Sequence, residues 1–364
     1  MNVLALTADS YSGKGGIAEF NRIFFRALMK TGYIHNIFIQ SRNQESSDIQ
    51  NDLIVDLNKS GSKAGYVFST IINTLKYKPD VIFCGHINLV LPAWIIAKIF
   101  GIPVWLNMHG IEAWKKPGQI KSKIIKSAKL VTCVSRFTRN KFLSWANMPP
   151  SRVMVLPNSI DENFKPGDRE LSRKKLGLNA DKILLTVGRL STTEQYKGQD
   201  KVINALPEIL ESYPDLIYII AGEGDDKNRL EIMAREKGVI KHVLFSGSIS
   251  SSSLPDYYSA ADLFVMPSTG EGFGIVYLEA MASGTRAMGL NEGGSIDPLQ
   301  DGLLGMVTTE DKLAQDIISA LGNNNTSDIA EQVIKTFGYK NFCQHVKCLF
   351  ELLLSRQVGT SCAE

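Results

Sequence analysis

Short apolar runs alternate along the chain with longer segments whose apolar residues recur at helical spacing. The runs predict buried strands at residues 3–7, 37–40, 80–84, 104–108 and 131–135, and again at 183–187, 216–220, 243–245 and 262–266. Between them, helices are expected at 17–30, 89–100 and 136–146, for example. Such alternation predicts an α/β fold with parallel sheets and right-handed crossovers, in which ligands bind at the carboxyl ends of the strands.

The most informative stretch follows the strand expected at 262–266 and reads PSTGEGFGIVYLEAMASG over residues 267–284. It predicts a glycine-rich turn and then a buried helix that ends at Gly284. The small turn Gly272-Phe273-Gly274 lets a ligand approach the backbone N–H groups at the positive end of that helix. Glu271 and Glu279 bracket this space. A surface role for Glu279 is disfavoured because it lies within an apolar run.

The pattern E-G-F-G-x-x-x-x-E at 271–279, followed by A-M-A-x-G and by Gly293-Gly294, resembles the signature of retaining glycosyltransferases of family 4, or glycosyl transferases group 1, of the kind that build bacterial polysaccharides and glycolipids. The resemblance implies the GT-B fold, in which two Rossmann-like domains have parallel sheets facing across a cleft. We expect an acceptor-side domain at 1–163, a nucleotide-sugar domain at 164–336, and a final helix at 337–364 that crosses back to the first domain. The specific motifs all lie after residue 185.

The resemblance also implies which residues bind the sugar donor. An arginine fork and a lysine point charge suit a diphosphate, and Arg189 and Lys197 match the family's phosphate-binding pair. Glu279 would accept both ribose hydroxyls, and Glu271 would hold the hydroxyls of the transferred sugar as a catalytic residue. The other donor-binding candidates are Gly15, Gly16, Glu223, Ile249, Gly272, Phe273, Gly274 and Ile275.

Candidates on the acceptor side follow two strands of the first half. His109 ends the strand expected at 104–108, where the resembled family keeps a histidine near the transferred sugar, and we predict a catalytic role for it. Glu112 corresponds loosely to an acid near the acceptor, and His86 ends the strand at 80–84. No residue suggests a covalent nucleophile. The resemblance instead implies front-face attack with the leaving phosphate as base, while domain closure excludes water.

Some positions depart from the family pattern and leave the substrate open. Residues 250–253 are all serine where relatives often have charged residues, which removes the guide to the nucleotide base. Arg286-Ala287-Met288 and Asp297 also differ from the residues usual in relatives, so the donor sugar stays undetermined. A GDP- or UDP-linked sugar is expected. No cofactor or metal is expected, because Asp225-Asp226 lacks a third ligand.

Charge divides the 364-residue chain, whose length alone predicts two domains. Residues 1–163 carry 20 Lys and Arg against 10 Asp and Glu, a net +10, and the remainder carries 20 against 27, a net −7. The segment from Lys115 to Lys141 is the most basic. It is either a solvated helix face or a surface that attracts anionic lipid headgroups. Nucleic acid is disfavoured because stacking aromatics are not interleaved. A membrane-borne acceptor, such as a polyprenyl-diphosphate-linked glycan, is therefore expected.

The remaining sequence features indicate a cytoplasmic protein, either free or peripheral on the membrane. The five cysteines are dispersed without a C-x-x-C pair, which favours reduced thiols. The start lacks a basic n-region and predicts a first strand, not a signal peptide. The apolar run at 89–106 contains Pro92, Lys98, Gly101 and Pro103 and is not expected to span a membrane.

Other functions remain open. GT-B folds also host sugar-nucleotide epimerases and phosphorylases, and a non-catalytic sugar-nucleotide sensor is a further alternative. Gly13-x-Gly15-x-x-Ala18 mimics a dinucleotide fingerprint, although no acid ends the second strand. Arg42 could bind a phosphorylated ribose there, so an NADP-dependent oxidoreductase is the most distant alternative.

Overall fold

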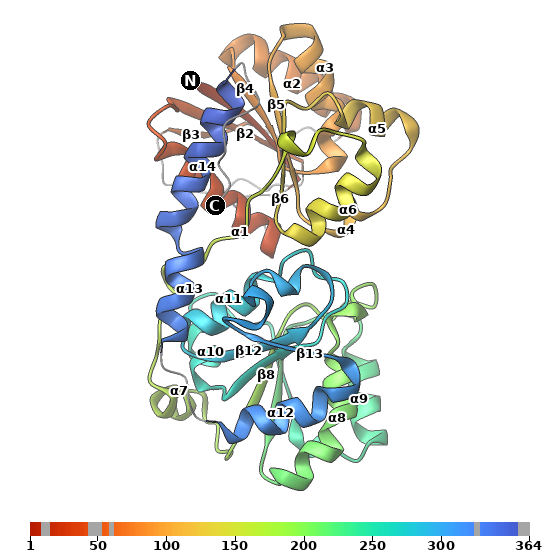
Figure 1. Cartoon of the computed structure of the whole chain (residues 1–364), viewed down its shortest axis with the longest axis vertical. Coiled ribbons are helices and arrows are strands. Elements are labelled where there is room, and N and C mark those ends of the chain that lie inside the picture. The colour runs from red at the N-terminus through yellow and green to blue at the C-terminus, as the bar shows by residue number, and fades with distance from the viewer. Residues whose placement is uncertain (9–14, 43–52, 58–61, 324–327, 356–364) are drawn as a thin grey trace. The chain divides into compact units, whose positions relative to one another are not determined.

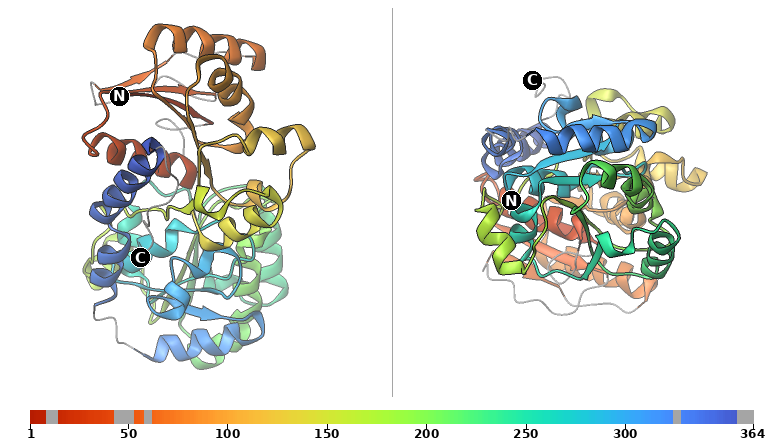
Figure 2. Two further views of the ribbon diagram at one scale, coloured as in Figure 1. Left: turned by 45° about the horizontal axis from the view of Figure 1, so that its top comes forward. Right: turned by 90° about the horizontal axis from the view of Figure 1, so that it is seen from below.

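The computed structural model describes residues 1–8, 15–42, 53–57, 62–323 and 328–355, and the chain divides into two compact units (Figure 1). The first unit contains Met1–Ser159 together with the segment that begins at Tyr339, and the second is Ile160–Gly338. Each unit is built around one parallel sheet with helices packed around it (Figure 2). The α/β architecture expected from the alternation of apolar runs is confirmed.

The sheet of the first unit has seven strands in the order β3-β2-β1-β4-β5-β6-β7. Their bounds are β1 Asn2–Thr7, β2 Asn36–Ser41, β3 Ile54–Asp56, β4 Val81–Cys84, β5 Val104–Met108, β6 Leu130–Cys133 and β7 Val153–Val155. β1 pairs in parallel with β2 on one side and β4 on the other. The direction of winding therefore changes between β1 and β4, which is where open α/β sheets bind ligands.

Helices cover this sheet through an apolar core. They are α1 Gly16–Met29, α2 Lys63–Tyr77, α3 Val90–Phe100, α4 Ile111–Trp114, α5 Gln119–Ile125, α6 Arg136–Ala146 and α14 Tyr339–Leu354. The Phe342 ring of α14 meets Phe20 of α1 edge to face, and the Tyr33 hydroxyl donates to Glu351. The final helix begins at Tyr339 and not at 337, because Gly338 adopts an extended conformation that interrupts the helical path.

The sheet of the second unit has six strands in the order β10-β9-β8-β11-β12-β13. The strands are β8 Ile183–Val187, β9 Ile217–Ala221, β10 Val243–Gly247, β11 Leu263–Met266, β12 Arg286–Leu290 and β13 Met306–Thr308. The helices are α7 Arg169–Leu176, α8 Gln199–Ser212, α9 Lys227–Glu236, α10 Leu254–Ala260, α11 Ile275–Ala282, α12 Leu313–Gly322 and α13 Ile329–Phe337. Here the winding changes between β8 and β11, which pair in parallel.

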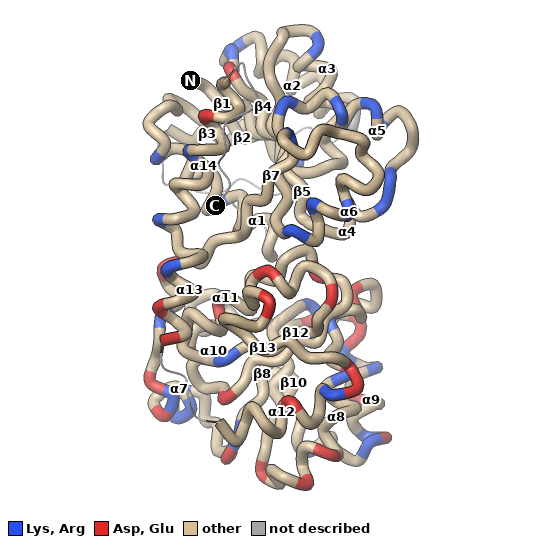
Figure 3. The backbone as a smooth tube through the Cα atoms, viewed as in Figure 1, with Lys and Arg blue, Asp and Glu red and all other residues tan. Residues whose placement is uncertain are grey.

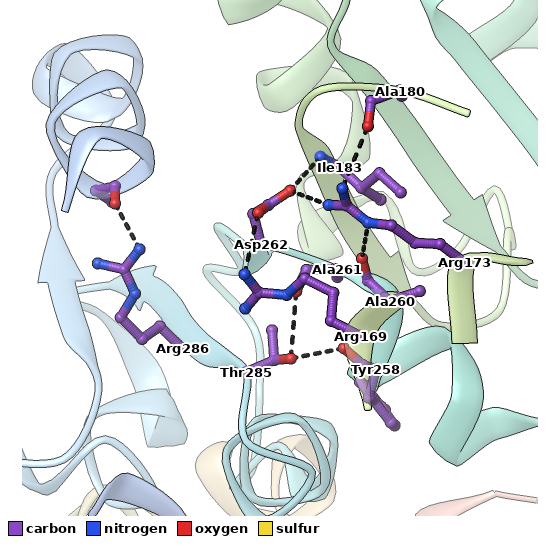
Figure 4. A network of polar contacts seen from close by, with 11 residues as sticks. Arg169, Arg173, Ala180, Ile183, Tyr258, Ala260, Ala261, Asp262, Thr285 and Arg286 are labelled. Atoms are coloured by element: carbon purple, nitrogen blue, oxygen red, sulfur yellow. Dashed lines mark hydrogen bonds and ion pairs between the residues drawn. The ribbon is translucent and has the colours of Figure 1, made fainter. Parts of the chain in front are cut away.

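A buried carboxylate anchors the amino ends of these two strands (Figure 4). Asp262, which precedes β11, accepts hydrogen bonds from the Ile183 backbone N–H at 2.7 Å and from Arg173 at 2.6 Å, and Arg169 lies at 3.4 Å. Both arginines belong to α7. The network therefore joins α7 to the sheet at the edge opposite the carboxyl ends of the strands.

Two further observations concern the expected location. Within the described ranges, none of the helices combines the length and the apolar character needed to cross a membrane. Cys84, Cys133 and Cys343 carry free thiols, and the first two are buried.

Candidate active site

An ion pair lies at the carboxyl ends of β8 and β11, the two strands between which the winding changes. Lys197 Nζ is 2.9 Å from Glu271 Oε1, and the two side chains are only 15% and 14% exposed. Lys197 ends the 3₁₀ helix η3 (Gln195–Lys197) beyond β8, and Glu271 lies in the loop between β11 and α11. The structure thus brings together two predicted sugar-donor residues that are 74 positions apart in the sequence.

A second carboxylate, which the sequence did not single out, contacts both predicted phosphate-binding cations. Glu194 accepts a hydrogen bond from the Arg189 guanidinium, and its other oxygen lies 4.0 Å from Lys197 Nζ. The Arg189 side chain is 76% exposed, and its ion pair with Glu194 is therefore at the surface. The only signal in the sequence was an acid three residues before Lys197. Two cations and two carboxylates therefore form a chain of alternating charge.

The pair keeps Lys197 charged. Burial by itself would lower the pKa of Lys197, but the charge of Glu271 and its hydrogen bond outweigh that effect and raise the pKa above its ordinary value. The ammonium group is therefore protonated throughout the physiological range. It remains a fixed cation at the switch point of the sheet.

The loop before α11 is constrained by its glycines. Gly274 precedes the helix with a φ of 89°, and a Cβ there would lie 2.6 Å from the Tyr277 ring. A Cβ on Gly294 would lie 2.1 Å from the Gly272 carbonyl oxygen, and the Gly294 N–H donates to the Glu271 carbonyl at 2.8 Å. These close approaches hold the backbone of Glu271 and Gly272 in place. Among the described residues, no side chain caps the first turn of α11, because the N-cap residue is Gly274.

Two predicted residues of this element have buried side chains. Phe273 packs against Phe337 with ring centroids 5.9 Å apart, so only its backbone is placed to meet a ligand. Glu279 is 8% exposed, and its Oε2 accepts a hydrogen bond of 2.7 Å from the Tyr258 hydroxyl. The alternative that Glu279 is an ordinary surface residue is therefore wrong.

The loops after β9 and β10 contribute Glu223 and Ile249 at the same edge of the sheet. Glu223 is exposed and Ile249 is half-buried. A Cβ on Gly222 would lie 1.9 Å from the Gly188 carbonyl oxygen, and the Glu223 carbonyl accepts a hydrogen bond from the Leu190 N–H. The loop that carries Glu223 therefore packs directly on the one that carries Arg189.

The predicted residues of the first unit follow β1, β4 and β5, at the carboxyl ends of adjacent strands. Gly15 precedes α1 with a φ of 108°, and Gly16 is the first residue of that helix. Gly13, which the dinucleotide alternative requires, lies outside the described residues. His86 follows β4, and its Nδ1 accepts a hydrogen bond from the Asn88 N–H. Burial lowers the pKa of His86.

His109 and Glu112 are joined through the backbone. Glu112 Oε1 accepts from the N–H groups of His109 and Gly110 and so fixes the turn after β5. His109 Nε2 lies 2.9 Å from the Gly85 carbonyl oxygen and 3.2 Å from Asn107 Nδ2. Burial lowers the pKa of His109, and the Glu112 charge offsets this only in part. His109 is therefore a neutral imidazole at pH 7, which suits hydrogen bonding with a sugar hydroxyl.

Two further acids, Asp225 and Asp226, have protein partners. Asp225 accepts from the backbone and hydroxyl of Thr192, and Asp226 pairs with Arg229 at 2.6 Å. In the part of the chain that the structure describes, no cluster of three or more His, Cys, Asp and Glu residues could hold a metal ion.

Two family models match the chain in succession. The model described as Glycosyltransferase Family 4 matches residues 14–164, and the model described as Glycosyl transferases group 1 matches residues 168–336. The chain belongs to the family 4 glycosyltransferases. The second match contains every residue of the Lys197–Glu271 site, and the first contains His86, His109 and Glu112.

Individual family 4 relatives resemble the chain over part of their length. A GDP-mannose-dependent alpha-(1-6)-phosphatidylinositol monomannoside mannosyltransferase of Mycolicibacterium smegmatis is 36% identical over 195 residues, covering 51% of this chain and 50% of the relative. A D-inositol 3-phosphate glycosyltransferase of Acidothermus cellulolyticus is 28% identical over 240 residues, covering 58% of this chain and 52% of that relative. The matched region therefore spans about half the length of these curated relatives.

Solved structures show the fold over the whole chain. Anabaena HepE in complex with UDP superposes with a TM-score of 0.79 at 20% identity, covering 96% of this chain and 100% of that chain. A sucrose-phosphate synthase from Thermosynechococcus elongatus gives a TM-score of 0.80, also at 20% identity, with coverage of 98% and 100%. The expectation of a GT-B fold is confirmed.

Proposed function

We propose that the protein is a retaining glycosyltransferase that moves a sugar from a nucleoside diphosphate to a hydroxyl group of a glycan or lipid-linked glycan. The observation that carries this proposal is the Lys197–Glu271 pair, flanked by Arg189, at the carboxyl ends of β8 and β11. A ligand with a diphosphate next to polyhydroxyl groups matches such a site. Membership of family 4 and the glycosyltransferase activities of the relatives support it.

The chemistry follows from where charge develops. As the diphosphate leaves, negative charge accumulates on its oxygens, and Arg189, Lys197 and the first turn of α11 are fixed groups that stabilise it. When the sugar donor is bound, Glu271 accepts hydrogen bonds from the hydroxyls of the transferred sugar in place of the one from Lys197. Glu279, whose carboxylate also accepts from Tyr258, accepts hydrogen bonds from the ribose hydroxyls.

Retention follows, in this proposal, from front-face attack in which the leaving phosphate takes the proton of the acceptor hydroxyl. His109, neutral because burial lowers its pKa, hydrogen-bonds to the transferred sugar and does not carry the proton. His86 and Glu112 belong to the acceptor side. Glu112 acts there through the turn it fixes, since its carboxylate accepts backbone N–H groups.

The acceptor proposed here is carried by a membrane, with a polyprenyl-diphosphate-linked glycan as the model substrate. The basic segment at 115–141 places Lys115, Lys116 and Lys123 at the surface, and Figure 3 shows basic residues around α4, α5 and α6. Cationic side chains attract anionic headgroups at about 1 kcal/mol each. The protein would then work at the cytoplasmic face of a membrane without a metal or cofactor of its own.

The first experiment measures thermal shifts of the wild type and Glu279→Ala with UDP, GDP, ADP, their sugar conjugates and NADP. A ligand at about 100 times its Kd adds roughly 2.7 kcal/mol to the free energy of unfolding, which a melting curve detects. We expect one nucleoside diphosphate, UDP or GDP, to stabilise the wild type and to lose most of that effect in the variant.

Other outcomes identify other functions. Stabilisation by NADP alone would overturn the glycosyltransferase proposal in favour of an oxidoreductase. Nucleotide-sugar binding followed by epimerised or phosphorolysed products, with no acceptor glycosylated, would point to the epimerase or phosphorylase alternatives. The family models do not favour these alternatives.

A further inference from the structure

We propose that a cavity at the amino ends of the strands of the second unit binds the phosphate group of a small ligand, apart from the Lys197–Glu271 site. A guanidinium group and a buried hydroxyl line this cavity, and both have hydrogen-bonding capacity that the protein does not use. The cavity would hold a ligand other than the sugar donor, so it does not depend on the proposed function.

The cavity has a volume of about 460 Å³ and is lined by parts of α7, α10 and α13 and by Ser283, the residue after α11. Its size falls in the range of small-molecule sites, about 300 to 1,000 Å³. Helix α11 begins beside the Glu271 loop and ends at Ala282, next to Ser283. Its eight residues span about 12 Å. The cavity is therefore at the end of α11 that is remote from the Lys197–Glu271 site.

Arg169 supplies a cation to the cavity wall. Its Nη1 lies 3.4 Å from Asp262 (Figure 4), whereas its Nε is buried and has no hydrogen-bond partner among the described residues. Asp262 does not depend on this contact, because Arg173 and the Ile183 N–H donate to it at 2.6 and 2.7 Å. Part of the Arg169 guanidinium is thus available to a ligand. The planar fork of an arginine matches the oxygens of a phosphate group.

The positive charge beside the cavity is only partly compensated. Arg286 Nη2 donates to the Ala320 carbonyl at 2.6 Å, and its Nε is also buried without a partner among the described residues. Burial, and then the charge of Arg169, lower the pKa of Arg286, so the two guanidinium groups repel each other. The charge of Asp262 offsets this effect only in part. A bound anion would relieve the repulsion.

Ser283 adds a hydroxyl that forms no hydrogen bond within the protein. The residue is 2% exposed, and in the described part of the chain its Oγ has no partner. Burying a hydroxyl without a hydrogen bond costs stability, so the folded protein gains nothing from it. Ser259, which is 6% exposed, brings a second hydroxyl to the same cavity. Because a hydroxyl hydrogen rotates to suit its acceptor, both serines can donate to phosphate oxygens.

Two acids restrict the rest of the ligand. Asp328 and Glu331 line the cavity and are exposed. Their carboxylates accept hydrogen bonds and repel a second anionic group. The phosphate group therefore belongs at Arg169, and hydroxyl groups at the other end of the ligand would face the acids. A small phosphate monoester that carries hydroxyl groups matches this distribution of charge better than inorganic phosphate does.

The test measures the melting temperature of the wild type against the concentration of inorganic phosphate and of glycerol 3-phosphate, at constant ionic strength. Each should raise it by about 3 °C at ten times its Kd, whereas sodium chloride and glycerol should not. Tighter binding of glycerol 3-phosphate would identify a monoester as the ligand, and equal binding would identify inorganic phosphate. Both results support the site, and no shift with either would overturn it.

Two variants of the cavity locate the bound phosphate. Ser283→Ala removes a buried hydroxyl without a partner, so without ligand it should melt at or above the wild-type temperature, yet it should bind phosphate about fivefold more weakly. Arg169→Gln should weaken binding about tenfold or more, because it removes the charge. Arg235→Gln is the matched control. Arg235 is a largely exposed arginine of α9, 4.0 Å from Glu231, and its replacement should keep the wild-type affinity.

Lys197→Ala decides whether the two sites are separate. It should keep the phosphate-dependent shift that Ser283→Ala and Arg169→Gln reduce. Loss of the shift in Lys197→Ala alone would place the phosphate at the sugar-donor site and overturn this inference. An equal shift in the wild type and in both cavity variants would also overturn it, since phosphate would then act only through its exclusion from the protein surface. These measurements do not involve sugar transfer, so the proposed function would stand in each case.

Discussion

At the scale of single residues, the centre of the site is an ion pair whose two charged side chains are buried together. Lys197 and Glu271 are about equally shielded from water, and each would be costly to bury without the other. Glu194 extends the arrangement to Arg189. In the proposed function, a diphosphate that enters this site would replace the carboxylates as the partner of the two cations. The carboxylates thus keep the cations charged and in position.

Replacing either member of the central pair should remove most of the activity without unfolding the protein. Glu271→Ala and Lys197→Ala are each expected to lower kcat about 100-fold or more, because fixed electrostatic groups at a transition state contribute on this scale. The charge left behind should cost stability, but water reaches 14–15% of its side-chain surface, so we expect a lower melting temperature and not unfolding. Sugar-transfer assays give kcat, and melting curves report the fold.

Lys201→Ala is the matched control for this pair. Lys201 is a lysine of α8 whose partner, Glu310, is largely exposed, so the substitution should leave kcat near the wild-type value. A Glu271→Ala or Lys197→Ala enzyme with near-wild-type kcat would remove that residue from the mechanism.

At the scale of elements, the turn into α11 depends on backbone atoms that touch each other. The loop at Gly293-Gly294 lies against the backbone of Glu271 and Gly272, as the 2.1 Å approach of a Gly294 Cβ to the Gly272 carbonyl oxygen shows. The loop that follows β12, about one supersecondary unit further along the chain, therefore helps to set the position of Glu271.

Gly294→Ala should destabilise the protein by about 3 kcal/mol and lower kcat, because the added methyl group must push the Glu271–Gly272 backbone away. Gly322→Ala is the control: its Cβ would meet only the Tyr213 hydroxyl, at an ordinary 3.5 Å, and Gly322 ends a helix in which alanine is favoured. Chemical denaturation and sugar-transfer assays on both variants test this. Equal stability of the two would show that the loop adapts without strain.

At the scale of the whole molecule, charge separates the two parts of the chain. Residues 1–163 carry a net +10 and the remainder a net −7, and Figure 3 shows the acidic residues gathered mainly in the second unit. The first unit also exposes apolar side chains of α2, namely Phe68, Ile72 and Leu75. Basic residues with exposed apolar side chains are features of proteins that bind membrane surfaces.

The protein should therefore co-sediment with vesicles that contain anionic lipid and not with neutral vesicles. Replacing Lys115, Lys116 and Lys123 by glutamine should weaken this binding strongly, since each contributes about 1 kcal/mol near an anionic surface. Binding should also fall as salt is added, because surface charges are screened.

The control for this experiment replaces three exposed lysines of the acidic unit, Lys174, Lys237 and Lys241, and removes the same charge from the protein. It should leave vesicle binding unchanged. Equal binding to neutral and anionic vesicles, or equal loss in both triple variants, would contradict a surface specific to the first unit.

The sequence by itself determined the strands, the fold class and most of the candidate residues, because apolar runs and glycine-rich turns act locally. The strands at 104–108 and 183–187 and the helix at 136–146 have the predicted bounds. The strands β3, β12 and β13 and the helix α2 were not predicted. A three-residue strand carries too few apolar positions to form a pattern, and α2 exposes part of its apolar side chains.

The tertiary structure decided which residues meet. The strand order places β8 beside β11, and only this order brings Lys197 to Glu271. The contact between Tyr258 and Glu279 likewise joins two different helices, and no motif records it. Local sequence sets the conformation of each element, whereas the partner of a buried charge depends on how distant elements pack. For that reason the charged residues of this site could be predicted from the sequence, whereas their pairing could not.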